Sequence, residues 1–323
     1  MQDDQPTIRK SGSLAERVVG KLTRQDGGAG HQDKLAARQA AATEESRPKA
    51  PEAPPAKAAV PAKPEAAPAK PPVAEPVTAE PSQPPLEINF NRLASFGFIT
   101  PSTERSNLTE EFRVIKRQVL KTAFEEGHNR RTENSNIIMV TSTSPAEGKT
   151  FVSLNLAVSL SMERDYYVLL IDGDNHRHSL TDIFGIEPGQ DGLVDLMVDR
   201  KLNLRDIIRR TNIPNLSFIP AGRPYAHGAE LLSSKEMASI MQDIAQRYPD
   251  RIVIIDTPPL TASTEGAVLS SNVGHALVVV EKDRTTKRQL QQTLQMLEGC
   301  PEVSCVLNMD TAAQRFSPYA YGY

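Results

Sequence analysis

Three consecutive residues, Gly148, Lys149 and Thr150, follow a short apolar run and open a segment with helical periodicity. Glycine lets backbone N–H groups turn toward an anion, lysine neutralises phosphate oxygens, and a threonine hydroxyl can bind Mg²⁺. These are the last positions of the phosphate-binding pattern G-x-x-x-x-G-K-[ST], although Thr143 stands where its first glycine belongs. The alternative is a helix N-terminus with a chance Gly-Lys-Thr, which the strand–loop–helix context disfavours. The predicted nucleotide-binding segment comprises Ser144, Pro145, Ala146, Glu147, Gly148, Lys149, Thr150 and Phe151.

Two further apolar runs end in aspartate side chains. The run "VLLIDGD" ends with Asp172 and Asp174, and "IVIIDTPP" has Asp256 at the end of its apolar part. A strand that ends in aspartate commonly holds Mg²⁺, or water bound to it, beside the terminal phosphate of a nucleotide. One aspartate could instead cap the next helix, but three beside one phosphate loop favour a shared site. Asp172 and Asp174 point the same way only if the strand continues through both, so their individual roles stay open.

The elements that must position these side chains are short apolar strands alternating with helices. Runs that are apolar on both faces are typical of strands in a buried parallel sheet, and the 3.6-residue period between them is typical of crossover helices. The sequence therefore predicts an α/β fold of the P-loop NTPase type, a doubly wound, mostly parallel sheet with helices on both faces. Such sheets bind ligands beyond the carboxyl ends of their strands. The predicted strands are residues 136–141, 166–172, 216–220, 251–257, 275–281 and 303–308, and the predicted helices are 148–162, 228–248 and 285–298.

Composition limits this domain to the later part of the chain. Residues 45–85 hold 13 of the 25 prolines, interleaved with Ala, Lys and Glu. Proline removes backbone donors, and the other residues supply little apolar area to offset chain entropy. We therefore expect a disordered Pro/Ala/Lys/Glu-rich tail over residues 1–89, a single domain over 90–310 and a flexible tail over 311–323.

Composition also argues against several classes of function. The net charge of −3 leaves no excess of basic residues that would attract nucleic acid, so no nucleic-acid partner is expected. No apolar run approaches the ~18 residues that a membrane span needs, so no direct membrane span is expected. Cys300 and Cys305 are expected to be reduced thiols, because Cys305 lies in a strand-like run and no secretory signal is visible.

Three segments resemble the nucleotide-binding motifs of one enzyme family. "SPAEGKTFVSLNLA", "LLIDGDNHRHSL" and "IVIIDTPPL" resemble the Walker A, Walker A′ and Walker B motifs of bacterial tyrosine autokinases of exopolysaccharide systems, the CpsD/CapB type. The resemblance covers about residues 105–323, and "EEFRVIKRQVL" most resembles the branch found beside exosortase systems. One departure follows Asp174, where the family usually has arginine and proline. Here His176 and His178 flank Arg177, and histidines in such a loop are expected to be solvated rather than metal ligands.

The resemblance implies ATP and Mg²⁺ as cofactors and gives roles to the residues above. Lys149 would contact phosphate and Thr150 would ligate Mg²⁺. Asp172 would act as the base or belong to the metal shell. The predicted catalytic residues are Lys149, Asp172, Asp174 and Asp256, the predicted metal ligands are Thr150, Asp172, Asp174 and Asp256, and Asn308 is either an adenine contact or an ordinary turn residue.

Upstream, residues 107–126 predict a helix whose charged stripe is separate from its apolar face. At about 100° per residue the apolar residues gather on one side, and Glu110, Arg113 and Lys116 lie mostly on the other. Solvated pairs within the helix are one interpretation, each stabilising by about 0.3 kcal/mol. The family has an E-x-x-R-x-x-R motif here that joins subunits, so the resemblance implies a ring-like homo-oligomer. Lys116 in place of the final arginine keeps the charge and loses the bidentate fork.

The chain ends in "SPYAYGY", with Tyr319, Tyr321 and Tyr323 on a segment that cannot easily bury them. The resemblance makes them the phosphate acceptors of an ATP-dependent tyrosine autokinase, which acts in trans within the oligomer and regulates exopolysaccharide polymerisation and export. The first alternative is a partitioning or positioning ATPase switch, whose loop has a lysine where this chain has Ser144. The second is a degraded kinase that serves as a scaffold, which the retained lysine and aspartates disfavour.

Kinases of this family usually need a membrane-embedded activator. The resemblance implies a separate chain-length-determinant protein as that partner, because this chain is expected to lack a span of its own. The expected localisation is therefore cytoplasmic and peripheral to the inner membrane, through the partner.

Overall fold

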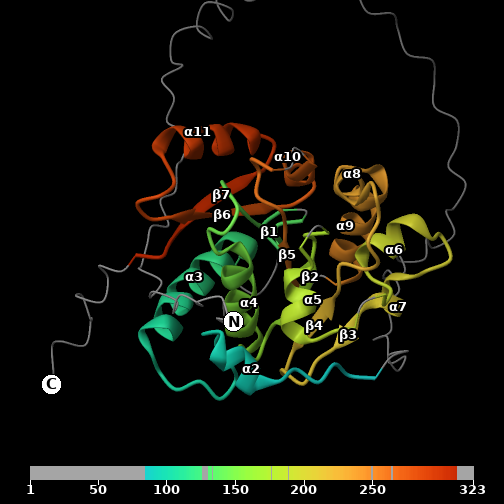
Figure 1. Ribbon diagram of the computed structural model, residues 1–323, viewed down its shortest axis with the longest axis horizontal. Coiled ribbons are helices and arrows are strands. Elements are labelled where there is room, and N and C mark those ends of the chain that lie inside the picture. The colour runs from blue at the N-terminus through green and yellow to red at the C-terminus, as the bar shows by residue number, and fades with distance from the viewer. Residues whose placement is uncertain are drawn as a thin grey trace, which may run out of the picture. The chain divides into compact units, whose positions relative to one another are not determined.

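The computed structural model describes residues 84–310, with gaps at 126–129, 133, 176, 188, 249 and 263–264, and its centre is one sheet (Figure 1). The strands are β1 (Ile137–Ser142), β2 (Tyr167–Asp172), β3 (Arg209–Arg210), β4 (Leu216–Ile219), β5 (Arg251–Asp256), β6 (His275–Glu281) and β7 (Glu302–Asn308). Their order is β3-β4-β2-β5-β1-β6-β7, and neighbouring strands are parallel except β3 against β4. The predicted doubly wound α/β fold is confirmed.

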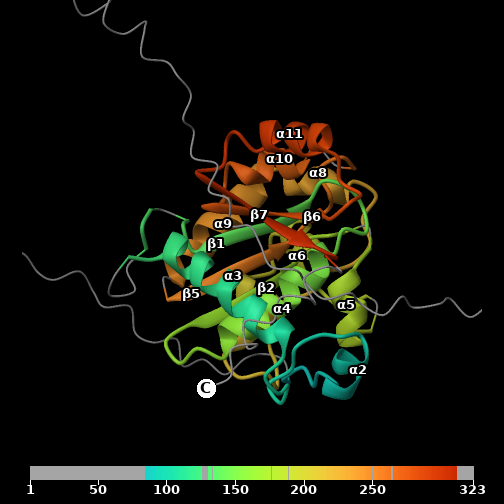
Figure 2. The same cartoon turned by 90° about the vertical axis from the view of Figure 1, so that its left-hand side faces the viewer.

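Helices cover both faces of this sheet (Figure 2). They are α2 (Phe90–Ser95), α3 (Asn107–Ala123), α4 (Lys149–Ser161), α5 (Ser179–Phe184), α6 (Leu193–Val198), α7 (Leu204–Ile207), α8 (Gly228–Leu232), α9 (Lys235–Arg247), α10 (Glu265–Ser270) and α11 (Lys287–Met296). Side chains of β1 alternate between the faces: Ile138 and Val140 pack with α2 to α5, whereas Ile137 and Met139 pack with α6 to α11. None of the helices described is both long and apolar enough to cross a bilayer.

Helix α4 is buried on all sides, which fixes the position of the residues in its first turn. Eleven of its thirteen residues are buried, as expected for a helix that is apolar around most of its circumference. Phe151 packs against Phe98 and Phe112, with ring centroids 5.3 and 6.3 Å apart. The polar side chain of Asn155 accepts a 2.6 Å hydrogen bond from the backbone of Ile99. The helix therefore holds its first turn against the sheet as a rigid unit.

The predicted strands are confirmed to within one residue at each end, and two helix predictions need correction. The predicted helix 228–248 is two helices, because Ser234 starts α9 by accepting a 3.1 Å hydrogen bond from the backbone of Met237. The predicted helix 107–126 ends at Ala123. Phe124 is buried in an extended conformation and forms a bridge with Arg130, so the helix cannot continue through it.

The fold begins before residue 90, so the predicted boundary of the N-terminal tail at residue 89 is wrong. The backbone N–H of Leu86 donates to the carbonyl of Arg210 at 2.7 Å. Ile88 is buried, and its backbone exchanges two 3.0 Å hydrogen bonds with the side chain of Asn212. This segment lies against the edge of the sheet at β3, which would otherwise present unpaired backbone groups.

His275, at the start of β6, makes the stability of the fold depend on pH. It is fully buried, and its Nε2 shares a 3.0 Å hydrogen bond with Ser304 while its Nδ1 has no partner among the described residues. Burial lowers the pKa of His275 from 6.5 to about 4. The unfolded chain therefore takes up a proton near pH 6.5, whereas the folded chain takes it up only near pH 4, so stability falls as the pH drops through this window.

We expect this histidine to remove about 3 kcal/mol of unfolding free energy between neutral pH and pH 4. Urea denaturation of the wild type and of His275→Gln, at neutral pH and near pH 4.5, measures the effect. The variant should lose less stability than the wild type on acidification. An identical loss in the two proteins would contradict the prediction.

Candidate nucleotide-binding and phosphotransfer site

The carboxyl ends of three adjacent strands bring the predicted site residues together. Strands β2, β5 and β1 are neighbours in the sheet, and Asp172 of β2 lies directly opposite Asp256 of β5. The loop after β1 leads into α4, whose first residue is Lys149. The lysine and the carboxylates therefore meet at the edge where ligands bind in sheets of this kind.

The loop between β1 and α4 has the backbone shape of a phosphate-binding loop. Ala146 and Gly148 have positive φ angles of 69° and 91°. Gly148 occupies the N-cap position of α4, and no side chain caps the helix there, so its first backbone N–H groups are left for a ligand. A Cβ atom on Gly148 would lie 2.1 Å from Nδ2 of Asn308, so glycine is required for space as well as for φ.

Lys149 is held inside the site by carboxylates. Its Nζ lies 2.8 Å from Oδ2 of Asp174, and the side chains are 9% and 2% exposed, so this is a buried ion pair. Burial by itself lowers the pKa of Lys149, but the charges of Asp256 and Asp174 outweigh it and the pKa is raised. Lys149 is therefore a charged ammonium group held against Asp174.

Thr150 and Asp256 form the second contact between helix α4 and the strand ends. The Thr150 hydroxyl donates to Oδ2 of Asp256 at 2.7 Å, and Ser153 donates to Oδ1 at 3.0 Å. Burial raises the pKa of Asp256, while the charge of Lys149 and the hydrogen bond from Thr150 oppose that rise. The carboxylate is thus fixed in one orientation beside the threonine that the sequence predicts as a metal ligand.

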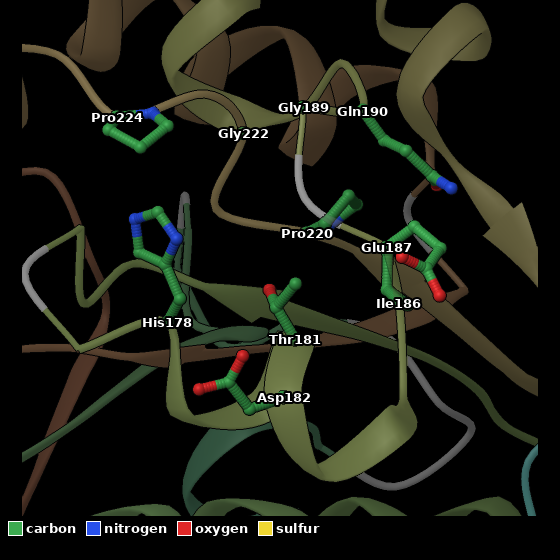
Figure 3. Close-up of a pocket in the computed structure, with 10 residues that line it drawn as sticks. All are labelled: His178, Thr181, Asp182, Ile186, Glu187, Gly189, Gln190, Pro220, Gly222 and Pro224. Atoms are coloured by element: carbon green, nitrogen blue, oxygen red, sulfur yellow. The ribbon is translucent and has the colours of Figure 1, made fainter.

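Asp172 is held by a different helix. Its Oδ2 accepts hydrogen bonds from the backbone N–H and the hydroxyl of Thr181, at 3.0 and 2.9 Å. Burial, followed by the charge of Asp256, raises the pKa of Asp172 to about 7. Thr181 also lines a small pocket of about 60 Å³ with His178 and Asp182 (Figure 3). A carboxyl group with this pKa can both release and accept a proton near neutral pH.

The donor set fits a magnesium–nucleotide complex better than a metal held by protein alone. Among the described residues, no three His, Cys, Asp or Glu side chains are grouped so that they could hold a metal ion. Mg²⁺ in nucleotide sites keeps several waters and binds one or two protein groups together with phosphate oxygens. Thr150 with Asp256 supplies such a pair. Asp174 is engaged with Lys149 instead, and Asp172 with Thr181.

Two predicted nucleotide contacts have other partners in the structure. Asn308, at the end of β7, donates a 2.8 Å hydrogen bond from Nδ2 to the carbonyl of Glu147, so its amide holds the phosphate loop. The Phe151 side chain is partly buried and packs against the core beside Phe98 and Phe112. His178, in the altered Walker A′ run, shares a 3.4 Å hydrogen bond with Asn175, and His176 lies outside the described residues.

The charged stripe of α3 is partly used within the subunit. Glu110 and Arg113 pair with each other at 3.0 Å, and the Arg113 side chain is 45% exposed. Lys116 is only 11% exposed: its Nζ pairs with Glu163 at 2.6 Å and donates to the carbonyl of Ser159 at 3.2 Å. Lys116 is therefore engaged within its own subunit, because the C-terminal end of α4 lies within its reach, and the role of the stripe in oligomerisation stays a prediction.

Sequence reasoning missed the hydroxyl side chains that orient the carboxylates. Ser153 follows Lys149 by four residues and so shares its face of the helix, a spacing that could have identified it. Thr181 comes nine residues after Asp172 on another helix, and its sequence position carries no signal. The predicted acceptors Tyr319, Tyr321 and Tyr323 lie outside the described residues.

Comparison with known proteins defines the class of this site. A protein family described as AAA domain matches residues 135–304, so the chain belongs to this family. The kinase domain of the Escherichia coli tyrosine kinase ETK is 30% identical, the match covers 68% of this chain and 81% of that domain, and the TM-score is 0.56. The chain belongs to the family of bacterial tyrosine-kinase domains.

Other similar proteins differ in how much of their own length this chain covers. The chimerical protein CapA2B2 is 27% identical over 70% of this chain and 94% of its own, with a TM-score of 0.56. Tyrosine-protein kinase ptk of Acinetobacter johnsonii is 35% identical over 164 residues, which are 51% of this chain and 22% of ptk. Tyrosine-protein kinase wzc of Salmonella typhimurium is 31% identical over 58% of this chain and 26% of wzc. This chain therefore spans about a quarter of these longer kinases.

Proposed function

We propose that this protein is an ATP- and Mg²⁺-dependent tyrosine autokinase that phosphorylates the terminal tyrosines of a neighbouring copy. The observation that carries the proposal is the buried cluster in which Lys149 and Thr150 of one helix turn meet Asp174 and Asp256. The similarity to the ETK kinase domain supports tyrosine phosphotransfer as the reaction of that cluster. Tyr319, Tyr321 and Tyr323 are the proposed acceptors.

The proposed chemistry divides among four side chains. Bound ATP with Mg²⁺ would supply the phosphoryl group and the positive charge of the metal. Lys149, on leaving Asp174, neutralises charge on the transferred group, which is usually the largest contribution to such a reaction. Thr150 and Asp256 hold the metal side of the site. Asp172, with a pKa of about 7, accepts the phenolic proton of the incoming tyrosine.

Phosphorylation would also change how the tail interacts with the site. Each phosphate adds a charge of roughly −1.5 to −2 at neutral pH. Several such groups would repel one another and the carboxylates of the site, so a fully phosphorylated tail would be released. The tail would thus be substrate and switch at once.

Phosphate mapping tests the proposal. The purified protein is incubated with Mg²⁺ and ATP, and modified residues are located by mass spectrometry, with Lys149→Met as the inactive control. We expect phosphate on Tyr319, Tyr321 or Tyr323 of the wild type alone. ATP hydrolysis without tyrosine phosphate would favour a positioning-type ATPase instead, and neither hydrolysis nor phosphate would favour a scaffold.

We further propose that α3 joins subunits into a ring, mainly through Glu110 and Arg113. Arg113→Ala should reduce the particle size measured by light scattering after size exclusion, without lowering thermal stability. Lys116→Ala should in addition cost about 1 kcal/mol of stability, because it removes a half-buried ion pair within the subunit. Arg117→Ala, an exposed neighbour on the same helix, is the matched control. A wild type that is monomeric in both phosphorylated and dephosphorylated forms would remove the basis for the ring.

The proposed cellular role rests on the similarity to the same family. We propose that the protein regulates exopolysaccharide polymerisation and export from the cytoplasmic side of the inner membrane, through a membrane-embedded chain-length-determinant partner. The assignment to the exosortase-associated branch is tested by whether exosortase genes neighbour this one. The partner is tested by adding its cytoplasmic segment to the kinase and measuring the rate of tyrosine phosphorylation, which should rise.

A further inference from the structure

Thr143 occupies the first glycine position of the phosphate-loop pattern, and the structure explains why a larger residue is tolerated there. The residues with positive φ in this loop are Ala146 and Gly148, whereas Thr143 has an ordinary backbone conformation. Its side chain is fully buried, and its Oγ1 accepts a 3.2 Å hydrogen bond from the hydroxyl of Thr293 on α11. On the other side, the hydroxyl of Thr261 donates to the carbonyl of Thr143 at 2.6 Å.

The middle of the phosphate loop is also held by the segment that runs from β6 into α11. Glu147 is 1% exposed, and its Oε2 accepts a 2.9 Å hydrogen bond from the backbone of Ser144, which closes the loop on itself. Its Oε1 accepts a hydrogen bond from the hydroxyl of Thr285, just before α11. The same Thr285 hydroxyl accepts a 3.1 Å hydrogen bond from the backbone of Glu281, so it connects the end of β6 to the loop.

We propose that Thr285 and Thr293 are positioning residues for the phosphate loop, which makes the segment from β6 to α11 a determinant of nucleotide affinity. Neither residue faces the position of the phosphates, since each acts through a buried partner in the loop. The inference rests on the proposed binding of ATP. It adds two residues from a part of the sequence that carries no nucleotide motif.

The physical reason is preorganisation. The backbone N–H groups of residues 146–149 bind phosphate only if they converge, and a loop that is already ordered loses less entropy on binding. A threonine hydroxyl that fixes Thr143 or Glu147 lowers that loss. Removing it should weaken ground-state binding more than it slows phosphoryl transfer, so KM should change more than kcat.

The test compares Thr293→Val, Thr285→Val and Thr143→Val with the serine variants Thr293→Ser and Thr285→Ser. Valine keeps the shape and loses the hydroxyl, and serine restores the hydroxyl. We expect each valine variant to bind ADP and ATP with Mg²⁺ about three- to tenfold more weakly, as the loss of one buried hydrogen bond implies, and each serine variant to recover. In nucleotide-free protein, hydrogen exchange of residues 143–150 should be faster in the valine variants.

Thr286→Val is the matched control. Thr286 caps α11 by accepting a 3.3 Å hydrogen bond from the backbone of Gln289, and the hydrogen bonds found for its side chain go to that residue and not to the loop. This variant should loosen α11 and leave nucleotide affinity unchanged. An equal loss of affinity in Thr286→Val and Thr293→Val would overturn the inference, because it would reduce the effect to helix stability.

Two further outcomes decide the inference. If Thr143 and Thr293 act through each other, the double valine variant should be no weaker than the worse single variant, and additive losses would contradict the contact. Unchanged affinity and unchanged exchange in folded Thr285→Val and Thr293→Val would also overturn it. A wild type that binds no nucleotide would contradict the proposed function instead. In that case, hydrogen exchange of the loop in nucleotide-free protein alone would test whether Thr285 and Thr293 order it.

Discussion

Replacing Lys149 with methionine is expected to abolish phosphate incorporation into the terminal tyrosines and to destabilise the nucleotide-free protein by about 3 kcal/mol. The variant leaves the buried carboxylate of Asp174 without its partner at 2.8 Å. It also removes the positive charge nearest to Asp256, which is buried as well. The activity loss follows from the proposed contact with phosphate, whereas the stability loss follows from the ion pair alone.

The two effects are measured separately, by phosphate mapping and by urea denaturation without nucleotide. Lys235→Met is the matched control, because Lys235 is exposed in the first turn of α9. It should leave both measurements unchanged. A Lys149→Met protein as stable as the wild type would show that the pair with Asp174 contributes no net stability. An active variant would refute the proposed role of the lysine.

Replacing Asp172 with asparagine should have the opposite effect on stability and the same effect on activity. In the fold the pKa of Asp172 is raised from 3.8 to about 7, so between these values the unfolded chain binds fewer protons than the folded one. Stability contributed by this group therefore falls as the pH rises from about 4 to about 7. Asparagine is never charged and can still accept the hydrogen bonds of Thr181, so the variant should be more stable by about 2–4 kcal/mol above pH 7.

The pH dependence identifies the cause of that gain. The stability difference between Asp172→Asn and the wild type should shrink as the pH falls and vanish near pH 4, where the wild-type carboxyl group is also neutral. Asp283→Asn, at an exposed turn position, should show no such gain. A gain that is independent of pH would point to packing rather than charge. Tyrosine phosphorylation should be lost in Asp172→Asn if Asp172 is the base.

Much of the site could be predicted because its signals are local. A strand, a loop and a helix start at adjacent positions, so the sequence places Lys149 and Thr150 directly. Aspartates at the ends of apolar strands meet because parallel strands end at the same edge of the sheet. The boundary between α8 and α9 at Ser233 and Ser234 could also have been predicted, since a serine before a helical segment is a common N-cap.

The remaining features depend on contacts between distant parts of the chain. Lys116 is 43 residues from Ser159 in sequence, and Thr293 is 150 residues from Thr143, so no local pattern relates either pair. The residues that cover the edge at β3 follow a proline-rich segment whose composition predicts disorder. Composition averages over a window, and a few apolar residues at its end can still find a partner in the fold.

In the proposed ring, Lys116 would face a neighbouring subunit while it is already paired within its own. An acidic group on a neighbouring subunit would compete with Glu163 for the charge of this lysine, so it would gain less attraction than from an unpaired lysine. This competition leaves Lys116 little to contribute, so we expect the free energy that closes the proposed ring to come mainly from other contacts. Lys116 also donates to the carbonyl of Ser159 near the end of α4, about 15 Å along the helix axis from Lys149 in its first turn. Loss of the contact between Lys116 and Ser159 would remove a restraint at the far end of α4, the helix that begins with Lys149.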